Sequence, residues 1–180
     1  YAPPYFGEAF IGSVPAFEPS NLIGRVVEAT LYDITKQDIS HMNIKLYFQI
    51  IDADASRAKT IFKGHEYARE YLKSLVRRGS SRVDGIFDIE TKDGYRLRVY
   101  PLALTRRRVN PSQESAIRKI MLEVMEEKAR SLTFDQLVQE MILGKAAADI
   151  FNRATKIAPL KHVGIRTVSY THLTLPTTER

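Results

Sequence analysis

Arginine side chains are grouped in two short segments of this sequence, and their chemistry indicates phosphate binding. The two groups are Arg77, Arg78 and Arg82 in the first segment, and Arg106, Arg107 and Arg108 in the second. All of these basic positions are arginine and none is lysine. A guanidinium group forms two parallel hydrogen bonds with a phosphate and stacks on bases, whereas a lysine ammonium acts as a point charge. The groups therefore favour RNA binding, and the alternative is ordinary solvated charge on a surface.

A β-hairpin is predicted between the two arginine groups. Residues 83–90 and 95–105 read as strands, and Asp93-Gly94 between them is a strong turn signal because glycine accepts a positive φ. A two-residue turn would set an apolar residue opposite an arginine, so we predict a three-residue loop with Gly94 in the left-handed conformation. The register then pairs Phe87 with Val99, Asp88 with Arg98, Ile89 with Leu97, and Glu90 with Arg96. It places two pairs of opposite charge across the strands.

The other elements must support this hairpin. Strands are predicted at 22–32, 42–51 and 160–166, a short strand or turn at 60–64, and helices at 66–78, 110–130, 133–144 and 146–157. Asn110 and Pro111 are typical of a helix start, and Arg118 and Lys119 extend the basic surface along that helix. This order of elements predicts an α+β fold.

Composition restricts the class of protein. The chain has 180 residues, a net charge of +6 and a pI near 9.5, which favours polyanionic partners. It contains no cysteine, which excludes disulfides and thiolate zinc sites. No apolar run approaches the ~18 residues of a membrane span, and no signal peptide is recognisable. We therefore expect a soluble intracellular protein, and since the first residue is Tyr1, we expect its native N-terminus to lie upstream.

No residue pattern indicates catalysis or a cofactor. The four histidines, at positions 41, 65, 162 and 172, have no nucleophile motif near them, and no glycine-rich phosphate loop occurs. His65-Glu66 lacks the second histidine of a zinc-protease helix, because Arg69 occupies that position. Asp52 and Asp54 could bind a divalent ion, but with no third ligand in sight we favour a turn. We expect no enzyme activity, no cofactor and no metal.

The first twenty residues form an arm rich in proline, glycine and aromatic side chains. Pro3, Pro4, Pro15 and Pro19 exclude a helix in this segment. Two interpretations remain open: a loose terminal arm, or an arm that packs its aromatic side chains on a partner.

Five motifs in fixed order resemble a known family. They are Tyr1-Ala2-Pro3-Pro4-Tyr5-Phe6, Leu22-Ile23-Gly24-Arg25-Val26-Val27-Glu28, Phe62-Lys63-Gly64-His65-Glu66, Arg77-Arg78-Gly79-Ser80-Ser81-Arg82-Val83-Asp84 and Thr91-Lys92-Asp93-Gly94-Tyr95-Arg96-Leu97-Arg98. Together they resemble small-subunit ribosomal proteins of the S-three-A-e type, also called eukaryotic S-one, in a form closer to the archaeal members. The resemblance covers about residues 1–166.

The resemblance implies a structural constituent of the small ribosomal subunit, near the messenger RNA exit platform. Implied partners are small-subunit rRNA, neighbouring ribosomal proteins and messenger RNA near the exit, with a cytoplasmic, ribosome-bound location and no membrane. The implied fold is a curved, barrel-like, mainly antiparallel β-sheet with about four helices packed against it. Tyr5 and Phe6 of the arm would dock against rRNA or a neighbour. The arginine groups, with Arg118 and Lys119, would be the RNA-binding residues.

The chain departs from the family pattern at both ends. The sequence begins at the arm, without the lysine-rich leader that usually precedes it, so we expect this chain to be a fragment. Residues 167–180 resemble translated sequencing-adapter sequence, so we predict one ribosomal domain at 1–166, with its arm at 1–20, and a non-native, poorly packed tail.

A protein-interaction module using the helical half is the alternative, since Met121, Met125 and Met141 could line a groove. Four arginines discriminate between RNA binding and the protein-interaction module: Arg78, Arg82, Arg106 and Arg107. If these side chains converge on one face without acidic partners, RNA binding is favoured. If each of them pairs with a carboxylate, the protein-interaction module is favoured.

Overall fold

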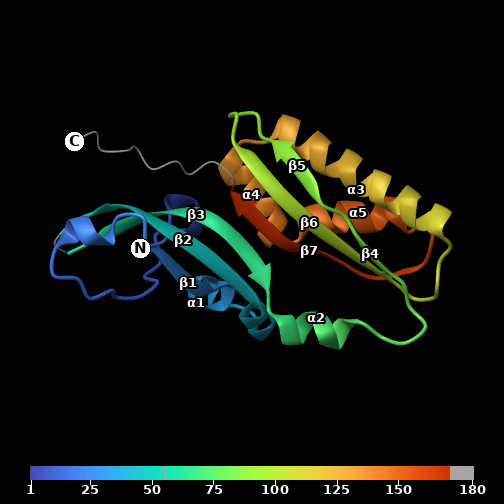
Figure 1. The fold of residues 1–180 in the computed structure, drawn as a ribbon, viewed down its shortest axis with the longest axis horizontal. Coiled ribbons are helices and arrows are strands. Elements are labelled where there is room, and N and C mark those ends of the chain that lie inside the picture. The colour runs from blue at the N-terminus through green and yellow to red at the C-terminus, as the bar shows by residue number, and fades with distance from the viewer. Residues whose placement is uncertain (55, 171–180) are drawn as a thin grey trace. The chain divides into compact units, whose positions relative to one another are not determined.

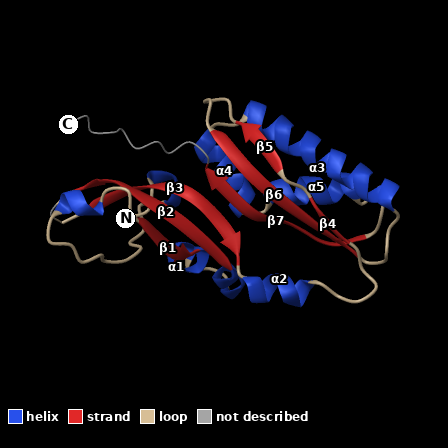
Figure 2. Ribbon diagram, viewed as in Figure 1, coloured by secondary structure: helices blue, strands red, loops and turns tan. Residues whose placement is uncertain are grey.

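The computed structural model describes residues 1–54 and 56–170, and the chain divides into two compact units. We call them the N-terminal unit, Tyr1–Ala68, and the C-terminal unit, which begins at Arg69. Strands pair antiparallel in both units, and helices accompany them (Figure 1, Figure 2). The predicted α+β class is confirmed. In the part of the chain that the structure describes, the strands do not close into a barrel.

The N-terminal unit is a three-stranded sheet in the order β1-β2-β3. Its elements are η1 (Pro4–Phe6), η2 (Pro19–Leu22), β1 (Val26–Thr30), α1 (Leu31–Thr35), η3 (Ile39–Asn43), β2 (Ile44–Ala53) and β3 (Ala58–Tyr67). Phe48 of β2 and Phe62 of β3 are fully buried, and Phe6 from the arm meets the Phe48 ring edge-on with centroids 5.7 Å apart. The arm therefore folds back onto its own sheet, while the expectation that Tyr5 and Phe6 dock against rRNA or a neighbour stays a prediction.

Two predicted boundaries in this region are wrong. The strand predicted to reach residue 32 ends at Thr30, because Thr30 caps helix α1: its hydroxyl accepts a hydrogen bond from the Asp33 N–H at 3.2 Å, and the Asp33 carboxylate accepts one from the Thr30 N–H at 2.9 Å. The predicted short strand at 60–64 is a ten-residue strand, since Glu66 and Tyr67 pair with β2. Helix α2 therefore begins only at Arg69.

The C-terminal unit is built around strand β6, which pairs with β4 and β5 on one side and β7 on the other. Its elements are α2 (Arg69–Leu75), β4 (Arg82–Asp84), β5 (Phe87–Glu90), β6 (Arg96–Thr105), α3 (Pro111–Ser131), α4 (Phe134–Ile142), α5 (Lys145–Ala154) and β7 (Leu160–Tyr170). Helices α3, α4 and α5 pack together against one face of these strands (Figure 2). The helices predicted at 110–130, 133–144 and 146–157 are confirmed. Helix α1 was not predicted.

The hairpin register is confirmed. Gly94 has a φ of 81°, and the Thr91 N–H donates to the Tyr95 carbonyl oxygen at 2.9 Å across the three-residue loop. Strand β5 pairs with β6 as Phe87 with Val99, Asp88 with Arg98, Ile89 with Leu97, and Glu90 with Arg96. Gly85 and Ile86 interrupt the predicted strand 83–90 and separate β4 from β5. A Cβ at Gly85 would lie 2.5 Å from the Phe87 ring, so a larger residue in this break would displace that ring.

The final strand is longer than predicted. Residues 167–170 continue β7 and pair with residues 97–100 of β6, and Val168 is buried. The expectation of poor packing is therefore wrong for Thr167–Tyr170, because β6 offers main-chain hydrogen bonds and an apolar face to whatever sequence follows Arg166. The rest of the predicted tail, 171–180, lies outside the described residues. The non-native origin of the tail stays a prediction.

Candidate nucleic-acid interface

The two arginine groups lie together at one end of the C-terminal unit (Figure 1). Arg82 pairs with Leu104 where β4 meets β6. One step further, the Thr105 N–H donates to the Ser81 carbonyl oxygen at 3.0 Å, and the Ser81 N–H donates to the Thr105 hydroxyl at 2.9 Å. Thr105 is fully buried. These bonds join the segment that holds Arg77, Arg78 and Arg82 to the segment that holds Arg106–Arg108.

Main-chain hydrogen bonds hold the second arginine segment in place. The Arg106 N–H donates to the Pro159 carbonyl oxygen at 2.9 Å, and the Val109 N–H donates to the Ser81 hydroxyl at 3.2 Å. The Thr105 hydroxyl lies 2.6 Å from the Arg107 carbonyl oxygen. The backbone is therefore anchored, while the side chains of Arg106, Arg107 and Arg108 are exposed.

The residues that the sequence predicts to bind RNA differ in whether they have acidic partners. Arg82 pairs with Asp84 at 2.7 Å. Arg118 lies 3.5 Å from Glu114 and donates to the Asp84 carbonyl oxygen at 3.0 Å. The other predicted residues form no ion pair with any residue that the structure describes: Arg77, Arg78, Arg106, Arg107, Arg108 and Lys119.

We call Arg77, Arg78, Arg106, Arg107 and Arg108 the basic edge. Of the four arginines that discriminate between the two functions, Arg78, Arg106 and Arg107 belong to the basic edge. Among the described residues, Arg82 alone of the four has a carboxylate partner. Arg118 and Lys119 lie roughly two helical turns into α3, and Arg118 reaches the end of β4 through its hydrogen bond to the Asp84 carbonyl oxygen.

Lys161 joins this surface, although sequence reasoning missed it. Strand β7 bulges here: Leu104 pairs with His162 and Thr105 with Leu160, so Lys161 has no partner residue on β6. A bulge redirects the side chain of its extra residue. The Lys161 ammonium lies 3.4 Å from the Leu75 carbonyl oxygen at the end of α2, beside the first arginine segment. Only a bulge signal in the sequence could have revealed this position, and a lone lysine near the start of a strand carries none.

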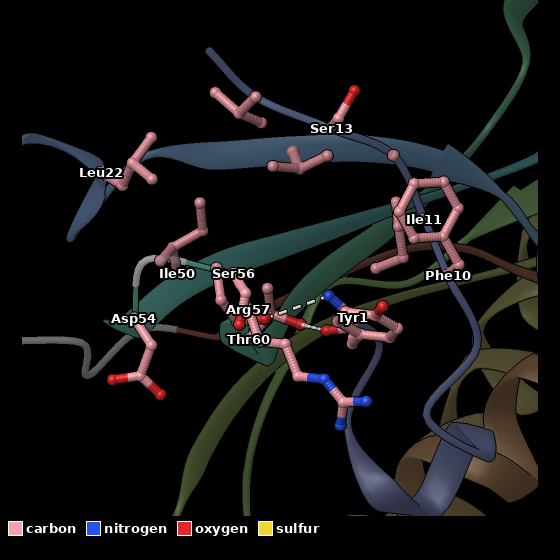
Figure 3. Close-up of a pocket in the computed structure, with 14 residues that line it drawn as sticks. Tyr1, Phe10, Ile11, Ser13, Leu22, Ile50, Asp54, Ser56, Arg57 and Thr60 are labelled. Carbon is pink, nitrogen blue, oxygen red and sulfur yellow. Dashed lines mark hydrogen bonds between the residues drawn. The ribbon is translucent and has the colours of Figure 1, made fainter. Parts of the chain in front are cut away.

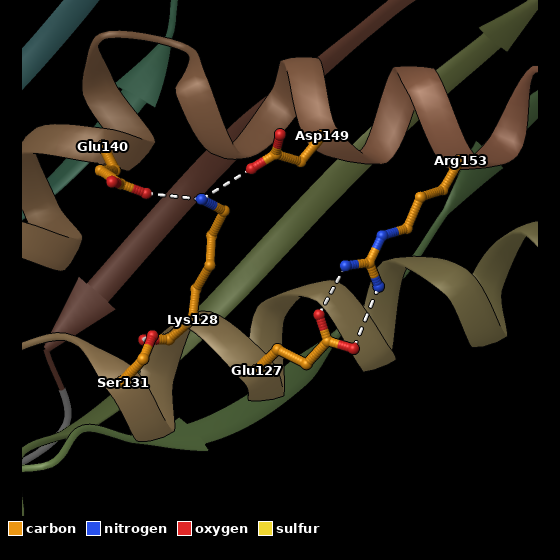
Figure 4. Close-up of polar contacts among 6 residues, drawn as sticks. All are labelled: Glu127, Lys128, Ser131, Glu140, Asp149 and Arg153. Carbon is orange, nitrogen blue, oxygen red and sulfur yellow. Dashed lines mark hydrogen bonds and ion pairs between the residues drawn. The ribbon is translucent and has the colours of Figure 1, made fainter.

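Two cations on the helical side of the same unit, Lys128 and Arg153, are neutralised internally (Figure 4). The Lys128 ammonium lies 2.6 Å from Glu140 and 2.7 Å from Asp149, and so joins α3, α4 and α5. Burial alone lowers the pKa of Lys128, but its hydrogen bonds to these carboxylates outweigh burial and raise it. Arg153 forms two hydrogen bonds with Glu127, which hold the pKa of that carboxyl below its usual value. Lys128 and Arg153 therefore differ from the arginines of the two groups above that form no ion pair among the described residues.

The methionine groove expected for the alternative function does not occur. Met121, Met125 and Met141 are buried in the core between the helices. They cannot line a surface groove for a partner, so this basis for the protein-interaction module is wrong.

A hollow of about 200 Å³ lies in the N-terminal unit (Figure 3). Apolar side chains of the arm and sheet line most of it, and Arg57 stacks over the Tyr1 ring at 5.2 Å from the centroid. Near it, the Asp54 N–H donates to the Arg57 carbonyl oxygen at 2.7 Å, and Asp52 lies 3.9 Å from Lys59. Asp54 therefore belongs to the connection between β2 and β3, as favoured from the sequence, whereas Asp52 lies in β2 and pairs with Lys59 of β3.

The described residues contain neither a metal-binding cluster nor a membrane-spanning helix. No group of three His, Asp or Glu side chains there could hold a metal ion. None of the helices in these ranges has the length and apolar character needed to cross a membrane.

Comparison with known proteins gives consistent matches over most of the chain. The model of the Ribosomal S3Ae family matches residues 1–172. Small ribosomal subunit protein eS1 of Staphylothermus marinus is 53% identical over 164 residues, covering 91% of this chain and 77% of the relative. The eS1 protein of Desulfurococcus amylolyticus is 54% identical, with 91% and 76% covered, and that of Aeropyrum pernix is 51% identical over 168 residues, with 91% and 78% covered.

Proposed function

Because the chain belongs to the Ribosomal S3Ae family, we propose that it is a structural constituent of the small ribosomal subunit. The names of the relatives above describe small-subunit ribosomal proteins and do not describe enzymes. The sequence likewise carries no motif for catalysis. The proposed role of the chain is therefore structural: it is a component of the small subunit and in that way supports translation.

The basic edge is the surface that binds small-subunit rRNA in this proposal. One observation carries it: five exposed arginines from two distant segments are held together without carboxylate partners among the described residues. Arginines already paired with acids gain little from phosphate, since they must first lose an ion pair. Free guanidinium groups on an anchored backbone instead neutralise phosphates and release counterions.

We further propose a position near the messenger RNA exit platform, among neighbouring ribosomal proteins and close to messenger RNA, in cytoplasmic ribosomes. The family resemblance supports this placement. Co-sedimentation with archaeal small subunits tests it.

The salt dependence of rRNA binding tests the basic edge. Each phosphate contact contributes roughly 0.7–0.9 to the slope of log affinity against log salt concentration. Replacing Arg106, Arg107 and Arg108 with alanine should therefore lower that slope by about 2, measured by filter binding to purified small-subunit rRNA. Thermal stability should stay nearly unchanged, because these side chains are exposed.

A matched control removes the same charge elsewhere. Lys36, Lys92 and Lys145 are exposed and lie outside the basic edge, so their replacement with alanine should change the slope by much less. Equal slopes for the two triple variants would show that net charge alone binds the RNA, against the proposed site.

A further inference from the structure

Like charges in the basic edge repel one another, so the fold must hold its two segments together. Arg77 and Arg78 come from the loop after α2, whereas Arg106, Arg107 and Arg108 follow the end of β6. None of the five forms an ion pair with a carboxylate of the described residues. Cations without counter-charges between them favour separation. Binding of one RNA by both segments requires the opposite, namely a fixed spacing.

Strand pairing ends before it reaches these arginines. The ladder between β4 and β6 stops where Arg82 pairs with Leu104. One residue beyond it, the Thr105 N–H donates to the Ser81 carbonyl oxygen at 3.0 Å. Past this main-chain bond, the hydroxyl groups of Ser81 and Thr105 connect the two segments. We call these two side chains the hydroxyl bridge.

The hydroxyl bridge connects the segments in both directions. The Thr105 hydroxyl accepts a hydrogen bond from the Ser81 N–H at 2.9 Å, and the Ser81 hydroxyl accepts one from the Val109 N–H at 3.2 Å. The Thr105 hydroxyl has one proton to donate. The Arg107 carbonyl oxygen, at 2.6 Å, lies closer to it than the Ser81 carbonyl oxygen, at 3.1 Å. Thr105 therefore joins Ser81 of the first segment to Arg107 of the second.

We propose that Ser81 and Thr105 are positioning residues for RNA binding, which hold the two segments of the basic edge at one spacing. This inference rests on the proposed function and deepens it, because Thr105 is neutral, fully buried and unable to contact RNA itself. A preformed group of guanidinium side chains loses less conformational freedom on binding than two independent segments do. Loss of the hydroxyl bridge should therefore weaken RNA binding although every positive charge is retained.

Thr105→Val tests the hydroxyl bridge, because valine keeps the branched shape of threonine and lacks its hydroxyl. Filter binding of the full chain to purified small-subunit rRNA is measured over a range of salt concentrations, well below the melting temperature. We expect about tenfold weaker affinity, and a fall of about 1 in the slope of log affinity against log salt concentration. Because the net charge is unchanged, a smaller slope means that the fold brings fewer phosphates into contact.

Thr105→Ser separates positioning from stability. Serine keeps the hydroxyl but leaves a cavity in place of the buried methyl group, so the melting temperature falls while the wild-type slope is restored. Thr91→Val is a matched control. Thr91 is also buried, and its hydroxyl accepts a hydrogen bond from the Tyr95 N–H at 3.1 Å, but it precedes β6 whereas Thr105 ends it. Thr91→Val should lower the melting temperature and leave the slope unchanged.

Amide hydrogen exchange tests the hydroxyl bridge without RNA. The Ser81 N–H donates to the Thr105 hydroxyl, and the Val109 N–H donates to the Ser81 hydroxyl. By NMR, the Ser81 amide should exchange at least about tenfold faster in Thr105→Val than in wild type, and the Val109 amide should do so in Ser81→Ala. The Lys92 amide, which donates to main-chain carbonyl oxygens, should exchange at the wild-type rate in both variants.

Three outcomes overturn the proposal: a wild-type slope in Thr105→Val, a wild-type exchange rate of the Ser81 amide in that variant, or a slope lowered equally in Thr105→Ser. The last outcome would mean that lost stability alone explains the weaker binding. The variant with alanine at Arg106, Arg107 and Arg108 tests the proposed function separately. Wild-type rRNA binding by that variant contradicts RNA binding at the basic edge, whatever the exchange rates are. A lowered slope there with a wild-type slope in Thr105→Val contradicts positioning alone.

Discussion

His162 shows how one side chain can make stability depend on pH. It is more than half buried on β7, its ring meets Tyr71 edge-on with centroids 6.4 Å apart, and its Nε2 has no hydrogen-bond partner among the described residues. Burial lowers the pKa of His162 from its ordinary value of 6.5, and the charge of Lys161 lowers it further. The folded protein therefore favours the neutral ring.

The sign of the pH dependence follows from this lowered pKa. Below about pH 6.5 the unfolded chain takes up a proton that the folded chain resists, so the free energy of unfolding falls as the pH falls. In wild type, the melting temperature should drop more steeply between pH 7 and 5 than in His162→Gln. Identical slopes in thermal melts would contradict this account.

Gly94 has a left-handed backbone conformation, which residues with a Cβ adopt only at a cost in free energy. Its φ is 81°, and a Cβ there would meet nothing within 4 Å, so a substitution tests the backbone alone. We expect Gly94→Ala to lower the free energy of unfolding by about 1 kcal/mol in urea denaturation. Gly12→Ala is the matched control, since a Cβ there is equally free of contacts and its φ is not positive. A similar loss in both variants would argue against backbone strain.

At the scale of elements, the loop of the β5–β6 hairpin forms hydrogen bonds with both α3 and α4. The Lys92 N–H donates to the carbonyl oxygens of Ala129 at 3.0 Å and Leu132 at 3.4 Å, at the end of α3. The Asp93 carboxylate accepts a hydrogen bond from the Phe134 N–H at 3.1 Å, at the start of α4. The loop that turns the hairpin thus also supplies hydrogen-bond partners, from Lys92 and Asp93, to the end of α3 and the start of α4.

Loss of the Asp93 side chain should weaken that junction. Asp93→Ala leaves the first N–H of α4 without this acceptor, so we expect about 1 kcal/mol less stability in chemical denaturation. Lys92→Ala is the control, because the Lys92 contact is made by the main chain and survives the substitution. A Lys92→Ala variant as unstable as Asp93→Ala would place the effect in the loop itself.

For the whole molecule, the division of charge between the units predicts which cations bind rRNA. Residues 1–68 carry a net charge of −2, and residues 69–170 carry a net charge of +8. Replacing Arg106, Arg107 and Arg108 with alanine should therefore weaken rRNA binding more than replacing Lys36, Arg57 and Lys59, which are exposed in the N-terminal unit. Filter binding measures both triple variants. Equal losses of affinity would contradict a role for the division of charge.

Local signals in the sequence determined much of this protein. The hairpin register followed from Asp93-Gly94 and from charges placed to pair across the strands, and the starts of α3 and α4 followed from their caps. The five family motifs also indicated that the chain resembles small-subunit ribosomal proteins. These features depend on residues a few positions apart, so they can be read without knowing the fold.

Contacts between distant segments were decided only by the tertiary structure. It bonded Arg118 to the Asp84 carbonyl oxygen and Ser81 to Thr105, and among the described residues it left the basic edge without carboxylate partners. It also placed Lys161 at a bulge and turned Phe6 inward while Phe17 stayed exposed. Whether a charge is neutralised or an aromatic ring is covered depends on which groups meet in space, and that is set by packing and strand pairing across the chain.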